Sequence, residues 1–253
     1  HRSAWAVNFM SVVFSALAVM MVYLIIVRVA RRNDPDGGWL ARAGGLVGAV
    51  FLLFSDTFWN NAIEAEVYGL AAFMMTLLTW LGVVWYEHRR EPRSKWGLLL
   101  LIYLCGLGVG FHLGSLLVFP AFFYLVWMAT DRRLPVLDLT LVGVGIALFL
   151  ASTTYVTDPT VLLTLLVLYT LGCVVRAAWP QILRLIGRQD PDGLAWRPFA
   201  LFGLLLFVAG LTVHVVLMIR AGAVPEPAIN QTVPRDFDTL LDVLRRTQYP
   251  PIN

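Results

Sequence analysis

The sequence predicts an all-α polytopic membrane protein with about eight transmembrane helices. Hydrophobic residues make up 59% of its 253 residues and charged residues only 14%, and the mean hydropathy is +0.75. A soluble domain is roughly half apolar and one quarter charged. The basic residues lie in short stretches between long apolar runs. This pattern is typical of membrane topology and argues against nucleic-acid binding despite the net charge of +3.

Long apolar runs define the expected membrane segments in chain order. They cover residues 6–27, 42–58, 67–86, 96–111, 116–129, 136–154, 160–177 and 198–219. Polar or turn-forming stretches separate these segments. Basic residues separate them at 28–37, which also contains an Asp-Pro-Asp-Gly turn, at 89–95, at Arg132-Arg133 and at 184–197. The other separators are the polar cluster at 54–70, the short link at 112–115 and the stretch around Asp158. The fourth and fifth segments are short for a ~30 Å hydrocarbon core. A tight hairpin of tilted helices and a partly re-entrant pair both remain open for them.

The basic residues also predict the orientation. Of the 19 Lys and Arg residues, 14 fall on one side of the eight-segment arrangement and 5 on the other. The positive-inside rule makes the first side cytoplasmic. The polar cluster, His112 and Arg220 are therefore expected at the outer face. The frequent Ala, Gly, Val and Arg residues favour a bacterial inner membrane, and the outer, active face would then lie in the periplasm.

The polar cluster between the second and third segments is the strongest functional candidate. Ionisable residues are costly at the edge of a membrane span, so they indicate a functional site. The cluster contains Asp56, Trp59, Asn60, Asn61, Glu64, Glu66 and Tyr68. An alternative is that these residues only start a helix at the interface, with the aromatic side chains as anchors.

Helical geometry separates the two glutamates of this cluster. If Trp59–Leu70 begins a helix, then Asn60, Glu64 and Tyr68 form one stripe. Glu66 would lie about 200° from Glu64 around that helix. Only one of the two carboxylates could then face a site, and the other would face water, headgroups or the helix N-terminus.

Two cationic or titratable residues are further candidates at the outer face. His112 follows the fourth segment, where a histidine can bind a phosphate group, titrate or end a helix. Arg220 ends the last segment and could hold a lipid phosphate, although snorkelling from a helix end is an alternative. Beyond it, Phe237, Leu240, Leu241 and Leu244 predict a short amphipathic helix on the outer membrane surface.

The sequence offers no metal or cofactor signature. Cys105 and Cys173 each lie inside an apolar run, without a Cys or His partner at metal spacing. Alternating Gly106, Gly108 and Gly110 do not follow the order of a dinucleotide-binding turn, and close helix packing is the expected role. We expect no metal site and no tightly held cofactor.

Four motifs follow one another along the chain. They are Ser55-x-Thr57-Phe58-Trp59 with Ala65-Glu66-Val67-Tyr68-x-Leu70, Gly106-Leu107-Gly108-x-Gly110-x-His112-Leu113, Ile219-Arg220-Ala221 with Pro227-x-Ile229-Asn230, and Leu244-x-Arg246-x-Gln248-Tyr249. These motifs resemble the membrane family known as domain of unknown function 2723 (DUF2723), which is grouped with protein O-mannosyltransferases of the GT-C glycosyltransferase superfamily. In the last motif Pro250 replaces the family's usual glycine.

The resemblance implies a GT-C-like helical bundle that transfers a sugar from a polyprenyl-phosphate donor to a protein hydroxyl at the outer face. The sugar would be mannose or similar, and the partners would be membrane lipid, the lipid-linked sugar and an acceptor protein or peptide. The resemblance makes Glu66, Trp59, Tyr68 and Asn61 substrate-binding residues, and His112 and Arg220 lipid-phosphate-binding residues.

The resemblance also implies that part of the enzyme is absent from this sequence. The family's first span and its acidic loop should precede residue 1, so we expect the catalytic base upstream and an inactive isolated fragment. We expect residues 1–221 to form a partial transmembrane GT-C module, and residues 222–253 an extracytoplasmic strap and amphipathic helix. The alternatives are a transporter or flippase for a lipid-linked or polar solute, and a non-catalytic membrane scaffold.

Overall fold

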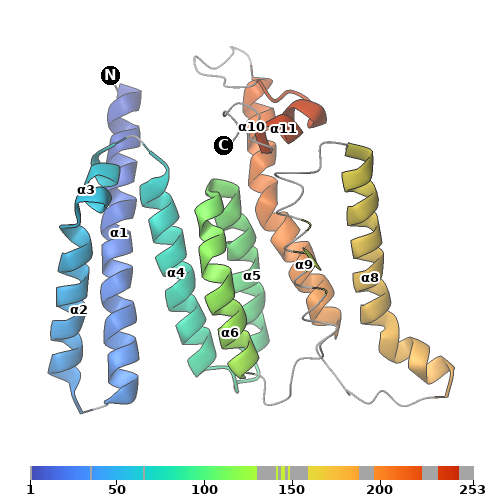
Figure 1. The fold of residues 1–253 in the computed structure, drawn as a ribbon, viewed down its shortest axis with the longest axis horizontal. Coiled ribbons are helices and arrows are strands. Elements are labelled where there is room, and N and C mark those ends of the chain that lie inside the picture. The colour runs from blue at the N-terminus through green and yellow to red at the C-terminus, as the bar shows by residue number, and fades with distance from the viewer. Residues whose placement is uncertain are drawn as a thin grey trace, which may run out of the picture. The chain divides into compact units, whose positions relative to one another are not determined.

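The computed structural model describes residues 2–34, 36–64, 66–129, 141, 144, 145, 148, 159–187, 197–223 and 233–244. Within these residues every regular element is helical, as Figure 1 shows. The chain divides into two compact units. The first contains His1–Asp131 with Leu206–Leu211, and the second contains Arg132–Leu205 with Thr212–Asn253.

The first unit is built around the long helix α1 (Arg2–Asn33). Helices α2 (Gly38–Leu53) and α4 (Tyr68–Glu87) both pack against it and flank it on either side in Figure 1. Small residues allow the close approach of α2: a Cβ at Gly45 would come within 2.6 Å of Val27 Cγ2 on α1. The predicted segments 6–27 and 67–86 are thus confirmed as helices.

The chain between α2 and α4 does not follow the prediction. The expected segment 42–58 is not one helix, because α2 ends at Leu53 and α3 (Asp56–Ile63) begins after a bend of 64°. The condition that Trp59–Leu70 begins one helix is also not met, since α3 ends at Ile63 and Glu64 is extended. The physical reason is topological. To pass from one side of α1 to the other, the chain must cross α1, and α3 packs on α1 during that crossing.

Helix α5 (Ser94–Phe111) confirms the predicted segment 96–111. The predicted segment 116–129 is not one α-helix, because the 3-10 helix η1 (Leu113–Val118) precedes α6 (Phe119–Ala129). The 11 residues of α6 extend only about 16 Å, well short of a bilayer core. A buried glycine allows close packing, as expected: Gly106 of α5 lies directly against the Phe207 carbonyl group.

The second unit contains α8 (Pro159–Leu185), the N-terminal part of α9 (Arg197–Leu211), η2 (Thr212–His214), α10 (Val215–Ala221) and α11 (Phe237–Leu244). The predicted short helix at 237–244 is present, with Leu240 buried and Phe237 exposed. Asp236 caps it: the Thr239 N–H donates to Asp236 Oδ1 at 2.9 Å, and the Asp236 N–H donates to Thr239 Oγ1 at 3.2 Å. This reciprocal arrangement is a capping box.

The described residues contain four helices long and apolar enough to cross a membrane. They are Trp5–Arg32, Tyr68–Glu87, Ser94–Phe111 and Phe202–Ala221, and the bent pair α2–α3 adds a fifth if it counts as one span. The prediction of eight spans is therefore not confirmed. Expected segment 136–154 lies almost wholly outside the described residues. At expected segment 160–177, α8 contains the apolar stretch Leu163–Trp179, which is shorter than the four spanning helices. The expected division at residue 221 stays a prediction.

Candidate functional site

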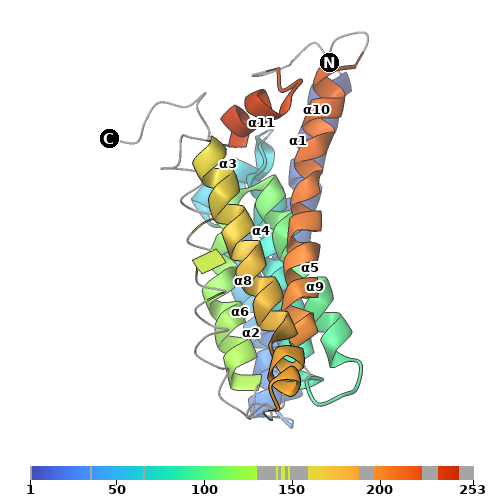
Figure 2. The same ribbon diagram turned by 90° about the vertical axis from the view of Figure 1, so that its right-hand side faces the viewer.

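The two ends of the first unit differ in charge. We call residues 54–68 and 111–118, with the first turns of α1, the polar end. Residues 28–42 and 86–96 form the basic end. Apart from Arg2, every Lys and Arg among residues 1–129 belongs to the basic end. In Figures 1 and 2, α3 lies toward the N-terminal end of α1, away from the connection between α1 and α2.

The polar end is held to α1 by a buried serine. The Ser11 hydroxyl, with 4% exposure, donates to the Glu66 carbonyl oxygen at 3.0 Å. The Glu66 N–H in turn donates to the Glu64 carbonyl oxygen at 2.9 Å, which closes a tight turn. The backbone of Glu66 is therefore anchored on α1, while the residue itself is exposed. The carboxylate of Glu66 can reach a ligand without disturbing this anchor.

Because Glu64, Glu66 and Val67 lie outside both α3 and α4, the stripe predicted for Asn60, Glu64 and Tyr68 does not form. Both Glu64 and Glu66 are exposed. The geometric reason for allowing only one of them in a site no longer holds. The preference for Glu66 now depends on the motif resemblance and on its anchored backbone.

Tyr68 and His112 come together at the polar end. Their ring centres lie 5.4 Å apart with an interplanar angle of 67°, an edge-to-face contact. Tyr68 begins α4 and His112 follows α5. The contact thus joins the motif at 55–70 to the motif at 106–113, the first two of the four motifs described above.

The backbone around His112 determines which ring nitrogen bears hydrogen. The Gly114 N–H donates to His112 Nδ1 at 3.0 Å, so Nδ1 is an acceptor. The neutral ring therefore carries its hydrogen on Nε2, which is a donor. The Ser115 hydroxyl, fully buried, donates to the Gly108 carbonyl oxygen at 3.0 Å and secures the turn after α5. This arrangement holds the imidazole in one orientation.

The remaining candidates lie on other elements. Trp59 of α3 stacks on Phe54 with ring centres 6.4 Å apart and is 48% exposed. Asn61, also on α3, is half-buried. Arg220 belongs to the second unit, where it lies exposed near the C-terminal end of α10. There the Arg235 Nε–H donates to the Ala221 carbonyl oxygen at 3.4 Å.

Sequence reasoning missed the serines of α1. Ser11 and Ser15 are both 4% exposed, and a Cβ at Gly69 would come within 2.7 Å of Ser15 Oγ and 2.8 Å of the Ser11 carbonyl oxygen. Their spacing of four residues in an apolar helix places both hydroxyls on one face. That spacing was the signal that could have identified them.

The stretch around Asp158, most of the motif at 219–230, and Arg246, Gln248 and Tyr249 of the last motif lie outside the described residues. In the part of the chain that the structure describes, no group of three or more His, Cys, Asp or Glu side chains could hold a metal ion.

The apolar helices and the segregated charge indicate an integral membrane protein with a polar cluster at one end of its first helical unit. Residues 1–134 match the family described as the protein O-mannosyl-transferase TMEM260 N-terminal domain. The match covers more than half of the 253 residues, and the chain belongs to this family. It includes the motifs at 55–70 and 106–113, whereas the motifs at 219–230 and 244–249 lie beyond it.

This membership supports the resemblance to protein O-mannosyltransferases, whereas the DUF2723 and GT-C assignments stay predictions. No curated protein and no solved structure matches the chain.

Proposed function

We propose that this chain forms part of a membrane glycosyltransferase that transfers mannose or a similar sugar to a protein hydroxyl. Two observations support the proposal. The chain belongs to an O-mannosyl-transferase family, and the contact between Tyr68 and His112 joins two of its motifs at the polar end. The donor would be a polyprenyl-phosphate sugar that enters from the bilayer, and the polar end would face the outside of the membrane, opposite the basic end.

The proposed reaction needs a sugar site beside a phosphate site. The oxygen of the acceptor hydroxyl bonds to the sugar C1, and the bond from C1 to the donor phosphate oxygen breaks. The lipid phosphate leaves with the electron pair, and the hydroxyl proton passes to a base. No described residue is assigned as that base. Groups that stabilise the charge developing on the phosphate accelerate this step.

The polar end offers suitable side chains for both sites. Exposed Trp59 can stack on a sugar ring, and Glu66, Asn61 and Tyr68 can bind hydroxyl groups of sugar or acceptor. His112 can donate from Nε2 to a phosphate oxygen because Nδ1 is already an acceptor. Arg220 lies in the second unit and is proposed as a phosphate ligand from the motif resemblance alone, because a guanidinium binds phosphate with two parallel hydrogen bonds.

The test is sugar transfer by the full-length protein from a polyprenyl-phosphate sugar to an acceptor peptide. Glu66→Gln should lower kcat/KM by about tenfold or more, the loss expected for a hydrogen bond to a charged group. Glu64→Gln is the matched control, since it neutralises the neighbouring exposed carboxylate, and should keep activity within about twofold.

Arg220→Ala tests the phosphate site in the same assay. It should raise the KM for the donor or lower kcat by about tenfold. The control is Arg42→Ala, which removes an exposed cation at the basic end. Wild-type activity in both Glu66→Gln and Arg220→Ala would refute these assignments.

A further inference from the structure

A hollow lies at the basic end of the first unit, away from the candidate site. It has a volume of about 590 Å³ and is lined by four arginines and one carboxylate, together with Trp80 and two aliphatic residues of α1. The arginines are Arg28, Arg31 and Arg32 of α1 and Arg89, just after α4. The positive-inside rule accounts for basic residues on this side of the membrane. It does not account for four guanidinium groups around one hollow.

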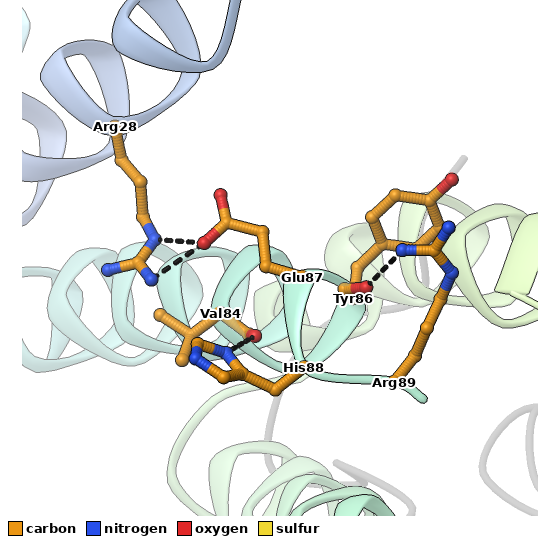
Figure 3. A network of polar contacts seen from close by, with 6 residues as sticks. All are labelled: Arg28, Val84, Tyr86, Glu87, His88 and Arg89. Carbon is orange, nitrogen blue, oxygen red and sulfur yellow. Dashed lines mark hydrogen bonds and ion pairs between the residues drawn. The ribbon is translucent and has the colours of Figure 1, made fainter. Parts of the chain in front are cut away.

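One of the four positive charges is already neutralised. Arg28 Nη2 lies 2.6 Å from Glu87 Oε2, and its Nε–H donates to the same oxygen at 2.7 Å. Figure 3 shows this pair reaching from α1 to α4. The guanidinium of Arg28 also lies 5.9 Å from the ring centre of Trp80. The lining therefore keeps a net excess of three positive charges, from Arg31, Arg32 and Arg89.

An aromatic ring orders two of these cations. The guanidinium carbons of Arg32 and Arg89 lie 4.9 Å and 4.2 Å from the ring centre of Tyr86. Arg89 Nη1 also donates to the Tyr86 carbonyl oxygen at 2.7 Å, as Figure 3 shows. Tyr86 itself is buried. A cation that is ordered before binding loses less conformational entropy when it binds an anion.

We propose that this hollow binds the phosphate headgroup of an anionic phospholipid, in the leaflet at the basic end. Leu24, Val27 and Trp80 give the hollow an apolar side, which suits the glycerol and first acyl carbons of a lipid. They lie on two helices of membrane-spanning length, near the end of each. A basic pocket between transmembrane helices is a suitable site for an anionic headgroup. A dissolved phosphate ion would gain nothing from the apolar side.

The test measures equilibrium binding of a short-chain phosphatidylglycerol to the detergent-solubilised full-length protein. Arg31→Gln/Arg32→Gln removes two lining cations, both exposed, and leaves the Arg28–Glu87 pair intact. We expect its Kd to rise about tenfold or more. Arg42→Gln/Arg90→Gln removes two exposed cations at the same end that do not line the hollow, and its Kd should stay within about twofold of wild type.

Two further ligands distinguish the source of the phosphate. Short-chain phosphatidylcholine, whose headgroup has no net charge, and inorganic phosphate should both bind much more weakly than phosphatidylglycerol. Equal weakening in the two double variants would overturn the site, because it would show a general charge effect. Inorganic phosphate binding as tightly as the lipid would overturn the lipid assignment. If Arg31→Gln/Arg32→Gln does not fold, Arg89→Gln with Arg93→Gln as its control makes the same comparison.

Discussion

The ring of Tyr68 meets the imidazole of His112 edge to face, with ring centres 5.4 Å apart. The two residues come from separate motifs and separate helix ends. The Gly114 N–H fixes one side of the imidazole at Nδ1, and Tyr68 contacts the ring itself. This geometry makes Tyr68 a positioning residue for His112 in the proposed site.

Loss of the aromatic ring of Tyr68 should therefore lower the rate of sugar transfer. An aromatic pair contributes about 0.5–1.5 kcal/mol, so we expect Tyr68→Ala to lower kcat/KM by roughly two- to tenfold. Tyr68→Phe keeps the ring and removes only the hydroxyl group proposed to bind substrate, so it should lose less activity than Tyr68→Ala. Steady-state kinetics with varied donor would measure both variants. An alanine variant as active as wild type would contradict the positioning role.

A methyl group at Gly69 should disturb the packing of α4 on α1. It would come within 2.8 Å of the Ser11 carbonyl oxygen, part of the α1 backbone. Overpacking of this kind costs about 1–3 kcal/mol, so Gly69→Ala should lower the thermal unfolding temperature. Gly44→Ala is the control, because nothing lies within 4 Å of its added methyl group, and helix propensity makes it neutral or stabilising. Equal unfolding temperatures for the two variants would show that α4 does not pack this closely.

The Arg28–Glu87 ion pair should couple α1 to α4. The two side chains are 32% and 24% exposed, so solvent screens the pair and we expect a coupling energy of only about 1 kcal/mol. A double-mutant cycle with Arg28→Gln and Glu87→Gln, followed by reversible unfolding, would measure it. The coupling should decrease at high salt. Additive single substitutions would mean that the pair contributes nothing to stability.

The capping box of α11 should weaken in acid. Hydrogen bonds from the Thr239 backbone and hydroxyl hold the pKa of Asp236 below its usual value. A lowered folded-state pKa means that the stabilisation is fully present above the unfolded-state pKa and is lost as the pH falls through the folded-state pKa. Asp236→Ala should therefore reduce the hydrogen-exchange protection of the Thr239 amide at neutral pH, and the difference from wild type should vanish in strong acid. Asp238→Ala, a first-turn control, should have a smaller effect.

Long apolar runs predicted several helices well, because burial of apolar side chains in a bilayer depends mainly on local sequence. The segments 6–27, 67–86 and 96–111 correspond to α1, α4 and α5. The bend before α3 and the extended residue Glu64 were not predictable in this way. They arise because α2 and α4 pack on either side of α1, which is a tertiary property.

The candidate site was predictable only in part. The polar cluster and His112 stood out because polar residues are rare between apolar runs. Tyr68 of this cluster contacts His112 because α4 packs beside α5 and η1. Residue spacing alone does not predict that packing. The role of Ser11 was missed because the spacing of Ser11 and Ser15 shows only that they share a helix face, and the partner of the Ser11 hydroxyl is a backbone carbonyl group on a distant segment.

The position of the sugar donor tests the central proposal most directly. A polyprenyl-phosphate sugar with a photoreactive group near its phosphate can be irradiated on the full-length protein, and the labelled peptides mapped by mass spectrometry. We predict labelling of peptides that contain residues 59–70 and 111–118, with loss of labelling when excess unmodified donor competes. Competable labelling confined to residues 24–32 and 80–89, at the basic end, would contradict a transfer site at the polar end.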